Sequence, residues 1–257
     1  MKEKVITVKR FAAFIIIAMC AVLLSSGANV QAAKDYKYSE KPEYGTLSNG
    51  STGYYIKNNA LYKYTYKTKK AKKLKNLNKK LYLYLSAAYG KNIYMTSENF
   101  DKWSLKTYYY NTKTKKVKYT KAKVSITSNS GQYAITQDEF RSDVSPFKTS
   151  LYKLTNSGMK KIKTLTEHGM SAHFINNKIY YADYPLDGKD DGAGMSQLDI
   201  YVCDKNGDNP KLLGTVKDET EYGTVYILKM KAKYCEVMMN DGNYRFTYET
   251  QQLKKIK

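Results

Sequence analysis

The sequence predicts an all-β protein, and three observations lead to this prediction. β-Branched and aromatic residues dominate its short apolar runs, which Asn-Gly, Asp-Gly and Ser-Gly pairs separate. No apolar stretch after residue 32 keeps a helical period. A Tyr-bearing strand recurs about every 40 residues, with three further strand candidates around it. Four short strands in each repeat are typical of β-propeller blades, whose radial repetition protects most sheet edges.

The first 32 residues predict an export signal. Four basic residues among the first ten precede an apolar run over residues 11–24. This run is too short to span a bilayer, which needs about 20 apolar residues, but it suits the core of a signal peptide. Val30-Gln31-Ala32 offers small residues at the expected cleavage site. We therefore expect a cleaved signal peptide over residues 1–32, a secreted or cell-wall-associated protein, and no stable membrane insertion after cleavage; an uncleaved anchor is the alternative.

The strands of the propeller follow in order along residues 51–257, which we expect to form five blades. First-strand candidates lie at 81–85, 124–127, 172–175 and 224–228. Tyr-bearing second strands are expected at 53–56, 92–95, 132–135, 178–181 and 234–237. Tyr-rich third strands are expected at 61–66, 105–110, 150–154, 198–203 and 244–248. Lys-rich fourth strands are expected at 72–74, 116–119, 160–162, 211–213 and 253–256. Residues 33–50 form an N-terminal segment that can complete a blade, which leaves six blades as the alternative.

One repeat resembles a known family. Residues 199–213 read DIYVCDKNGDNPKLL, which resembles the TolB-type propeller repeat, D-I-Y-V-M-D-x-D-G-x-N-x-x-x-L. Residues 59–74 and 150–165 look like weaker versions. The Tyr-rich and Lys-rich repeats behind an export signal are similar to the secreted, low-density-lipoprotein-receptor-related-like propellers of Gram-positive bacteria. The resemblance implies a binding platform, usually of six blades, with no catalytic residues to carry over.

The basic residues gather on the outermost strands and on the turns before them. The chain carries 44 Lys and Arg against 23 acids, for a net charge of +21. Lysine on an edge strand discourages edge-to-edge aggregation, but a basic belt can also hold a cell-wall polyanion, with a surface protein as the other partner. Nucleic acid is not expected, because only Arg141 and Arg245 follow the signal to read bases or phosphates. The candidate polyanion-binding residues are Lys69, Lys70, Lys72, Lys73, Lys115, Lys116, Lys160 and Lys161.

Acidic residues gather instead in the loops between second and third strands. In a propeller these loops meet on one face, which predicts a ligand-binding face there; solvated loop tips are the alternative. The candidates are Glu98, Asp101, Asp138, Glu139, Asp143, Asp183, Asp187, Asp190 and Asp191. Residues 187–192 resemble the start of a calcium loop, but Lys189 stands where an EF-hand needs an oxygen ligand. A looser Ca²⁺ site is the one cofactor alternative, and no other cofactor is expected.

Two residue types allow more than one interpretation. Cys203 and Cys235 can form a disulfide or remain two small buried residues, because the sequence does not supply the Cα separation that pairing requires. Tyr62, Tyr64 and Tyr66 alternate along one strand. They can pack between blades or line a contact surface.

Together these features predict a secreted, non-catalytic binding or scaffold propeller that engages cell-envelope polyanions or a surface partner. The alternative is a polysaccharide-cleaving glycosidase on the loop face. That chemistry needs two carboxyl groups at a defined separation, one of them with a raised pKa. Asp138, Asp183 and Asp241, near the ends of second strands, are the candidates.

Overall fold

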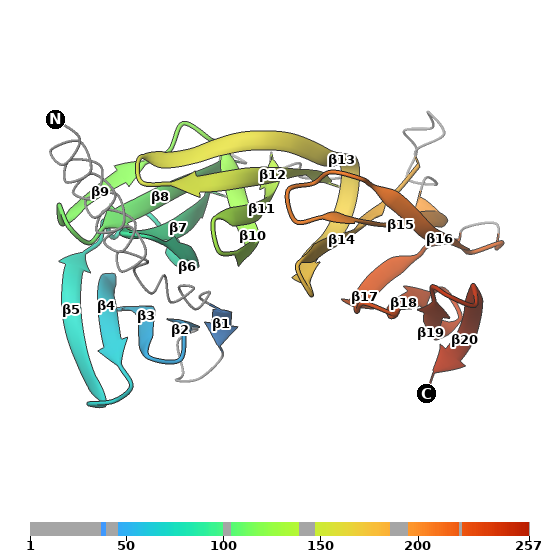
Figure 1. Cartoon of the computed structure of the whole chain (residues 1–257), viewed down its shortest axis with the longest axis horizontal. Coiled ribbons are helices and arrows are strands. Elements are labelled where there is room, and N and C mark those ends of the chain that lie inside the picture. The colour runs from blue at the N-terminus through green and yellow to red at the C-terminus, as the bar shows by residue number, and fades with distance from the viewer. Residues whose placement is uncertain are drawn as a thin grey trace, which may run out of the picture. The chain divides into compact units, whose positions relative to one another are not determined.

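A computed structural model describes residues 37–39, 46–99, 104–138, 147–185, 195–220 and 223–256. The regular elements of this part of the chain are the strands β1 to β20 (Figure 1). Its strands form four antiparallel sheets in which chain neighbours are sheet neighbours. None of the described residues forms a helix with the length and apolar character to cross a membrane. This chain order is the simplest way to build successive four-stranded groups, and it matches the predicted repeats.

The first two sheets are separate. The first contains β1 (Lys37–Ser39), β2 (Thr46–Ser48), β3 (Thr52–Lys57), β4 (Ala60–Thr65) and β5 (Lys70–Asn76). The second contains β6 (Leu83–Tyr89), β7 (Asn92–Asn99), β8 (Ser104–Asn111) and β9 (Lys116–Tyr119). Two strands from the N-terminal segment 33–50 thus extend the first sheet: β2 pairs with β3, and β1 pairs with β2.

A third sheet holds two of the expected repeats. It contains β10 (Val124–Ser130), β11 (Tyr133–Asp138), β12 (Phe147–Thr155), β13 (Gly158–Ile175), β14 (Lys178–Asp183), β15 (Gln197–Asp204) and β16 (Lys211–Lys217). The sequence predicts separate strands at 160–162 and 172–175, but both belong to the 18-residue β13. The first part of β13 pairs with β12 and the last part pairs with β14, with register shifts between them. Figure 1 shows this long strand linking the two groups.

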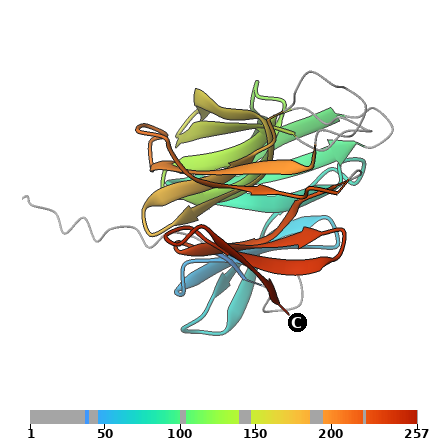
Figure 2. The same ribbon diagram turned by 90° about the vertical axis from the view of Figure 1, so that its right-hand side faces the viewer.

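The last sheet contains β17 (Tyr226–Met230), β18 (Tyr234–Met239), β19 (Gly242–Thr247) and β20 (Gln252–Ile256). Figure 2 shows its antiparallel strands in red. All four belong to the C-terminal part of the chain, so this group needs no strand from the N-terminus to reach four.

Hydrophobic clusters join each group of strands to the next. Because side chains alternate between the faces of a strand, one strand can serve two clusters. Ile93 and Met95 of β7 pack toward the first sheet, whereas Tyr94 between them packs toward the third. In the same way, Ile200 of β15 packs toward the last sheet and Cys203 packs toward β11 and β12. Each group therefore packs face to face with its neighbours in the chain, as blades of a propeller do.

The two cysteines do not pair. Cys203 and Cys235 are both buried and both free, and they belong to clusters on opposite sides of β15. Burial raises the pKa of Cys203 to about 11 and that of Cys235 to about 12. Both therefore stay protonated at neutral pH and act as small apolar residues.

Candidate functional site

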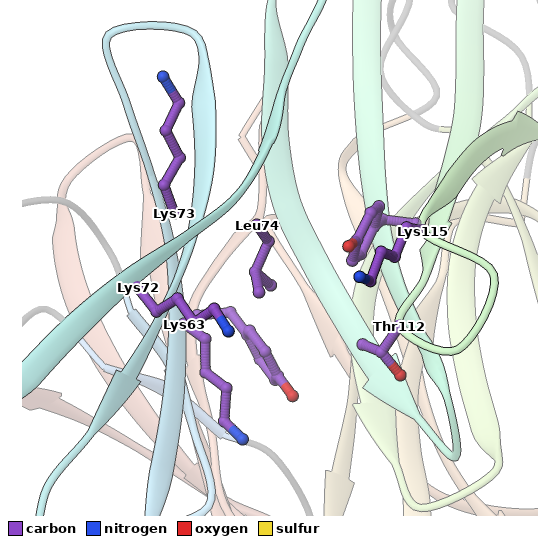
Figure 3. A pocket seen from close by; sticks show the side chains of 8 residues that line it. Lys63, Lys72, Lys73, Leu74, Thr112 and Lys115 are labelled. Atoms are coloured by element: carbon purple, nitrogen blue, oxygen red, sulfur yellow. The ribbon is translucent and has the colours of Figure 1, made fainter.

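The candidate site is a cleft between the first and second sheets, with a volume of about 430 Å³. This volume lies within the range of small-molecule sites, roughly 300–1,000 Å³. The first sheet contributes Tyr54, Lys63, Lys72, Lys73 and Leu74; the end of β8 and the turn before β9 contribute Tyr110, Thr112 and Lys115. Figure 3 shows Lys63 and Lys72 on one side of this space and Lys115 and Thr112 on the other.

Apolar and aromatic side chains form the floor of the cleft. Tyr54 and Tyr110 are buried members of the hydrophobic cluster between the two sheets, and Leu74 packs against that cluster. Burial raises the pKa of Tyr110, so its hydroxyl stays protonated at neutral pH. Aromatic side chains in this position give the cleft an apolar floor.

Lysine side chains form the walls of the cleft. Lys63 of β4 and Lys72 of β5 are directly opposite each other in the strand pairing. Like charges in this arrangement destabilise a sheet. Within the described residues, Lys63, Lys72, Lys73 and Lys115 lie outside all ion pairs with carboxylates. Their positive charge is therefore balanced by solvent alone in this part of the chain, which favours an anion in the cleft.

The turn that carries Lys115 is held in place by its own hydrogen bonds. The side-chain oxygen of Asn111 accepts from the backbone N–H of Lys113 at 3.1 Å and of Thr114 at 2.9 Å. The N–H of Lys115 donates to the carbonyl of Asn111 at 2.8 Å. Lys115 itself has a φ of 56°. The fixed turn presents the Lys115 side chain to the cleft.

The predicted polyanion-binding lysines divide into three sets. Lys72, Lys73 and Lys115 line the cleft. Lys161 bonds to Asp138, and the exposed Lys69, Lys70, Lys116 and Lys160 lie on outer strands or the turns before them. Four residues outside the predicted sets also line the cleft, namely Lys63, Tyr54, Tyr110 and Thr112. Because Lys63 alternates with Tyr62 and Tyr64, the sequence could have predicted that it lies on the other face of β4 from these tyrosines. It could not have predicted that this face lies across a cleft from the turn at Lys115.

Two of the predicted acidic ligand-binding residues have described side chains. Asp138 is 7% exposed and accepts hydrogen bonds from Thr136 Oγ1 at 2.6 Å, Ser150 Oγ at 2.5 Å and Lys161 Nζ at 2.9 Å. Asp183, at the end of β14, accepts a hydrogen bond from Thr166 Oγ1. Glu98 belongs to β7, but its side chain lies outside the described residues, as do Asp101, Glu139, Asp143, Asp187, Asp190 and Asp191.

The third carboxylate of the glycosidase alternative, Asp241, is exposed and bonds to one hydroxyl and one ammonium group. Asp241 Oδ2 accepts from Tyr244 Oη at 2.6 Å and from Lys255 Nζ at 3.1 Å. These bonds lower the pKa of Asp241. A general acid needs the opposite shift. Within the described residues, no group of three His, Cys, Asp or Glu side chains could hold a metal ion.

Comparison with solved structures supports a β-propeller fold. An oligogalacturonate lyase in complex with manganese matches with a TM-score of 0.51 and 11% identity, over 81% of this chain and 62% of its own. TolB from Acinetobacter baumannii matches with a TM-score of 0.42 and 13% identity, over 81% and 53%. Oligopeptidase B from Trypanosoma brucei matches with a TM-score of 0.48 and 10% identity, over 80% and 32%. The chain thus spans less than two thirds of each of these structures. No known protein family and no curated protein matches the sequence.

These comparisons correct the predicted function. The matched structures are for the most part enzymes, namely the oligogalacturonate lyase and several peptidases. The expectation of a non-catalytic binding or scaffold propeller is therefore wrong. That expectation came from the charge and the repeat pattern. Both indicate the fold of the molecule, and neither indicates which functional site the fold carries.

Proposed function

We propose that this chain is the propeller of an enzyme that acts on short acidic oligosaccharides, and that the cleft between the first two sheets holds the substrate. The observation that carries the proposal is the set of lysines around an aromatic floor, with no carboxylate partner among the described residues. Uronic acid units match this lining, because each has a carboxylate for an ammonium group and an apolar ring face for a tyrosine.

The structural neighbour with a TM-score of 0.51 supports the choice of ligand class, since it is an oligogalacturonate lyase. That lyase was solved with manganese, but the described residues here offer no cluster for such an ion. The proposal therefore relies on lysine for the charge of the ligand. It also replaces the expectation of a chain without catalytic activity, which a turnover assay tests directly.

We also propose five blades and an exported protein. The five groups are β2–β5, β6–β9, β10 to the first part of β13, the last part of β13 to β16, and β17–β20. Each group supplies four antiparallel strands, which supports a count of five blades. Export rests on the basic start and the apolar run of residues 11–24, which lie outside the described residues.

The test is a calorimetric titration of the protein with short oligogalacturonates, with their methyl esters as the uncharged control. We expect binding of the acids that weakens with added salt, and no binding of the esters. Formation of an unsaturated product, followed by ultraviolet absorbance, measures turnover in the same samples. Equal binding of acids and esters, or no binding of either, contradicts the proposal.

A triple variant localises the binding. Replacing Lys63, Lys72 and Lys115 by Gln keeps the size of the side chains and removes three positive charges. Since a hydrogen bond to a charged group contributes about 1.5–3 kcal/mol, affinity should fall by about 100-fold or more. The matched control replaces the exposed Lys69, Lys116 and Lys160 by Gln, which removes the same charge away from the cleft. A similar loss in both variants would show that net charge, and not the cleft, binds the ligand.

A further inference from the structure

One turn recurs at every junction between successive groups of strands. It connects the third strand of a group to the fourth, and it faces the preceding group. The four turns that face a preceding group are residues 112–115, 156–157, 205–210 and 248–251. We call them the junction turns. Three of them hold the preceding group by polar contacts, whereas the first one makes no such contact among the residues that the structure describes.

At the second junction, tyrosine hydroxyls reach the turn. Tyr94 Oη lies 2.8 Å from the carbonyl oxygen of Thr155 and 2.9 Å from that of Gly158. Tyr109 Oη donates to the carbonyl of Ser157 at 3.2 Å. The turn after β12 is therefore fixed to β7 and β8 by side chains from the second sheet.

At the third junction, a lysine reaches the turn. Lys163 Nζ of β13 donates to the carbonyl of Gly207 at 3.0 Å and to Asp208 Oδ1 at 2.7 Å. The approach is close enough to require glycine: Gly207 has a φ of 85°, and a Cβ there would lie 2.9 Å from the Lys163 side chain. At the fourth junction, Gln251 Nε2 donates to the carbonyl of Leu213 at 2.7 Å.

At the first junction, Lys115 occupies the place of Gln251. Both are the last residue of their turn, and both have positive φ, 56° and 54°. Gln251 finds a carbonyl oxygen across its junction, whereas Lys115 faces Lys63 and Lys72 across the cleft. Within the described residues, no hydrogen bond or ion pair spans this cleft from Lys115. This junction would be closed by a group that accepts hydrogen bonds from the lysines on both sides of the cleft.

We infer that a carboxylate of the substrate fills this position. It would accept from Lys115 on one side and from Lys63 or Lys72 on the other, as the carboxylate of Asp208 accepts from Lys163. With this ligand bound, the first junction would have a polar contact like the other three. The ligand would then connect the first sheet to the second. The identity of the ligand as a uronate rests on the proposed function, but the position of the carboxylate rests on the comparison of junctions.

The experiment supplies the carboxylate from the chain itself, by the substitution Lys115→Glu. Lys113→Glu is the matched control, because it changes the charge of the same turn equally without lining the cleft. We expect Lys115→Glu to raise Tm by about 2–4 °C and to weaken oligogalacturonate binding at least tenfold. Lys113→Glu should change neither quantity by as much. In the wild-type protein, oligogalacturonate should slow amide hydrogen exchange in β4 and β5.

The outcomes separate this inference from the proposed function. If wild-type protein binds oligogalacturonate but Lys115→Glu leaves binding and Tm unchanged, or if exchange in β4 and β5 does not slow, the inferred position is wrong while the ligand class stands. If no oligogalacturonate binds but Lys115→Glu still raises Tm, the ligand class is wrong while the junction position stands. If Lys115→Glu lowers Tm and the control does not, the turn does not accept a carboxylate there, and the inference fails.

Discussion

The first and third junctions of this molecule have nearly the same parts and opposite outcomes. In both, a lysine-bearing strand faces the turn between the third and fourth strands of the next group. At the third junction the turn carries Asp208, and Lys163 bonds to it. At the first junction the turn carries Lys115, and a cleft of about 430 Å³ remains. A negatively charged turn is thus found at the closed third junction, and a positively charged turn at the open first junction.

The energy of the contact does not explain this difference. The side chains of Lys163 and Asp208 are 37% and 54% exposed, and exposed pairs contribute little to stability. Lys163 does lower the pKa of Asp208 through a hydrogen bond and its charge. The charges instead affect the distance between the turn and the facing strand. Opposite charges attract the turn to the strand, and like charges repel it.

The largest expected effect on stability comes from the ion pair between Lys161 and the buried Asp138, which can be compared with the junction contact of Lys163. Lys161 and Lys163 lie two residues apart on β13, but Lys161 bonds to the buried Asp138. The change Lys161→Met leaves that carboxylate without its cation, and since the Lys161 side chain is itself 38% exposed, the free energy of unfolding should fall by about 2–3 kcal/mol. Chemical denaturation measures it. The exposed neighbour Lys160→Met is the control, and an equal loss in both variants would contradict the assignment.

A smaller effect is expected when the second junction is broken. Burial raises the pKa of Tyr94 to about 12, so its hydroxyl stays a donor at neutral pH. The change Tyr94→Phe removes this donor from two carbonyls of the next turn, at an expected cost of about 1–2 kcal/mol. Tyr109→Phe removes only the longer bond of 3.2 Å and should cost less. The reverse order in thermal denaturation would show that the hydroxyl of Tyr94 does not hold this junction.

The smallest effect is a dependence on pH. Asp218 connects the end of β16 to the turn before β19, accepting from Asn240 N at 3.3 Å and from Thr220 Oγ1 at 2.7 Å. Burial alone would raise the pKa of Asp218, but the hydrogen bonds it accepts, from Thr220, Asn240 and Thr224, outweigh burial and lower it below its ordinary value of 3.8.

The sign of this dependence follows from linkage. A lowered folded-state pKa stabilises the fold above the ordinary value, and this contribution is lost as the pH falls through the folded-state pKa. We therefore expect Asp218→Asn to flatten the loss of Tm between about pH 4 and pH 2. A variant whose acid limb matches that of the wild type would contradict this role.

Much of the frame was predictable from local signals. Strands are expected at 92–95, 132–135, 178–181 and 234–237, and β7, β11, β14 and β18 lie there, with β11 beginning one residue later, at Tyr133. Alternation and turn residues suffice for this, because strand formation depends on neighbours along the chain. The sequence did not predict that 160–162 and 172–175 belong to one strand. The residues between them do not distinguish a bend within a single strand from a turn between two strands.

The sequence by itself determined that this protein repeats four-stranded units and that lysines concentrate on their outer strands. Only the tertiary structure decided which charges meet. Asp138 and Lys161, predicted for two different binding surfaces, bond to each other, while Lys63 and Lys115 face each other across a cleft. The reason is physical: a strand fixes the face on which a side chain lies, but the partner on that face comes from another repeat, through packing that no local pattern encodes.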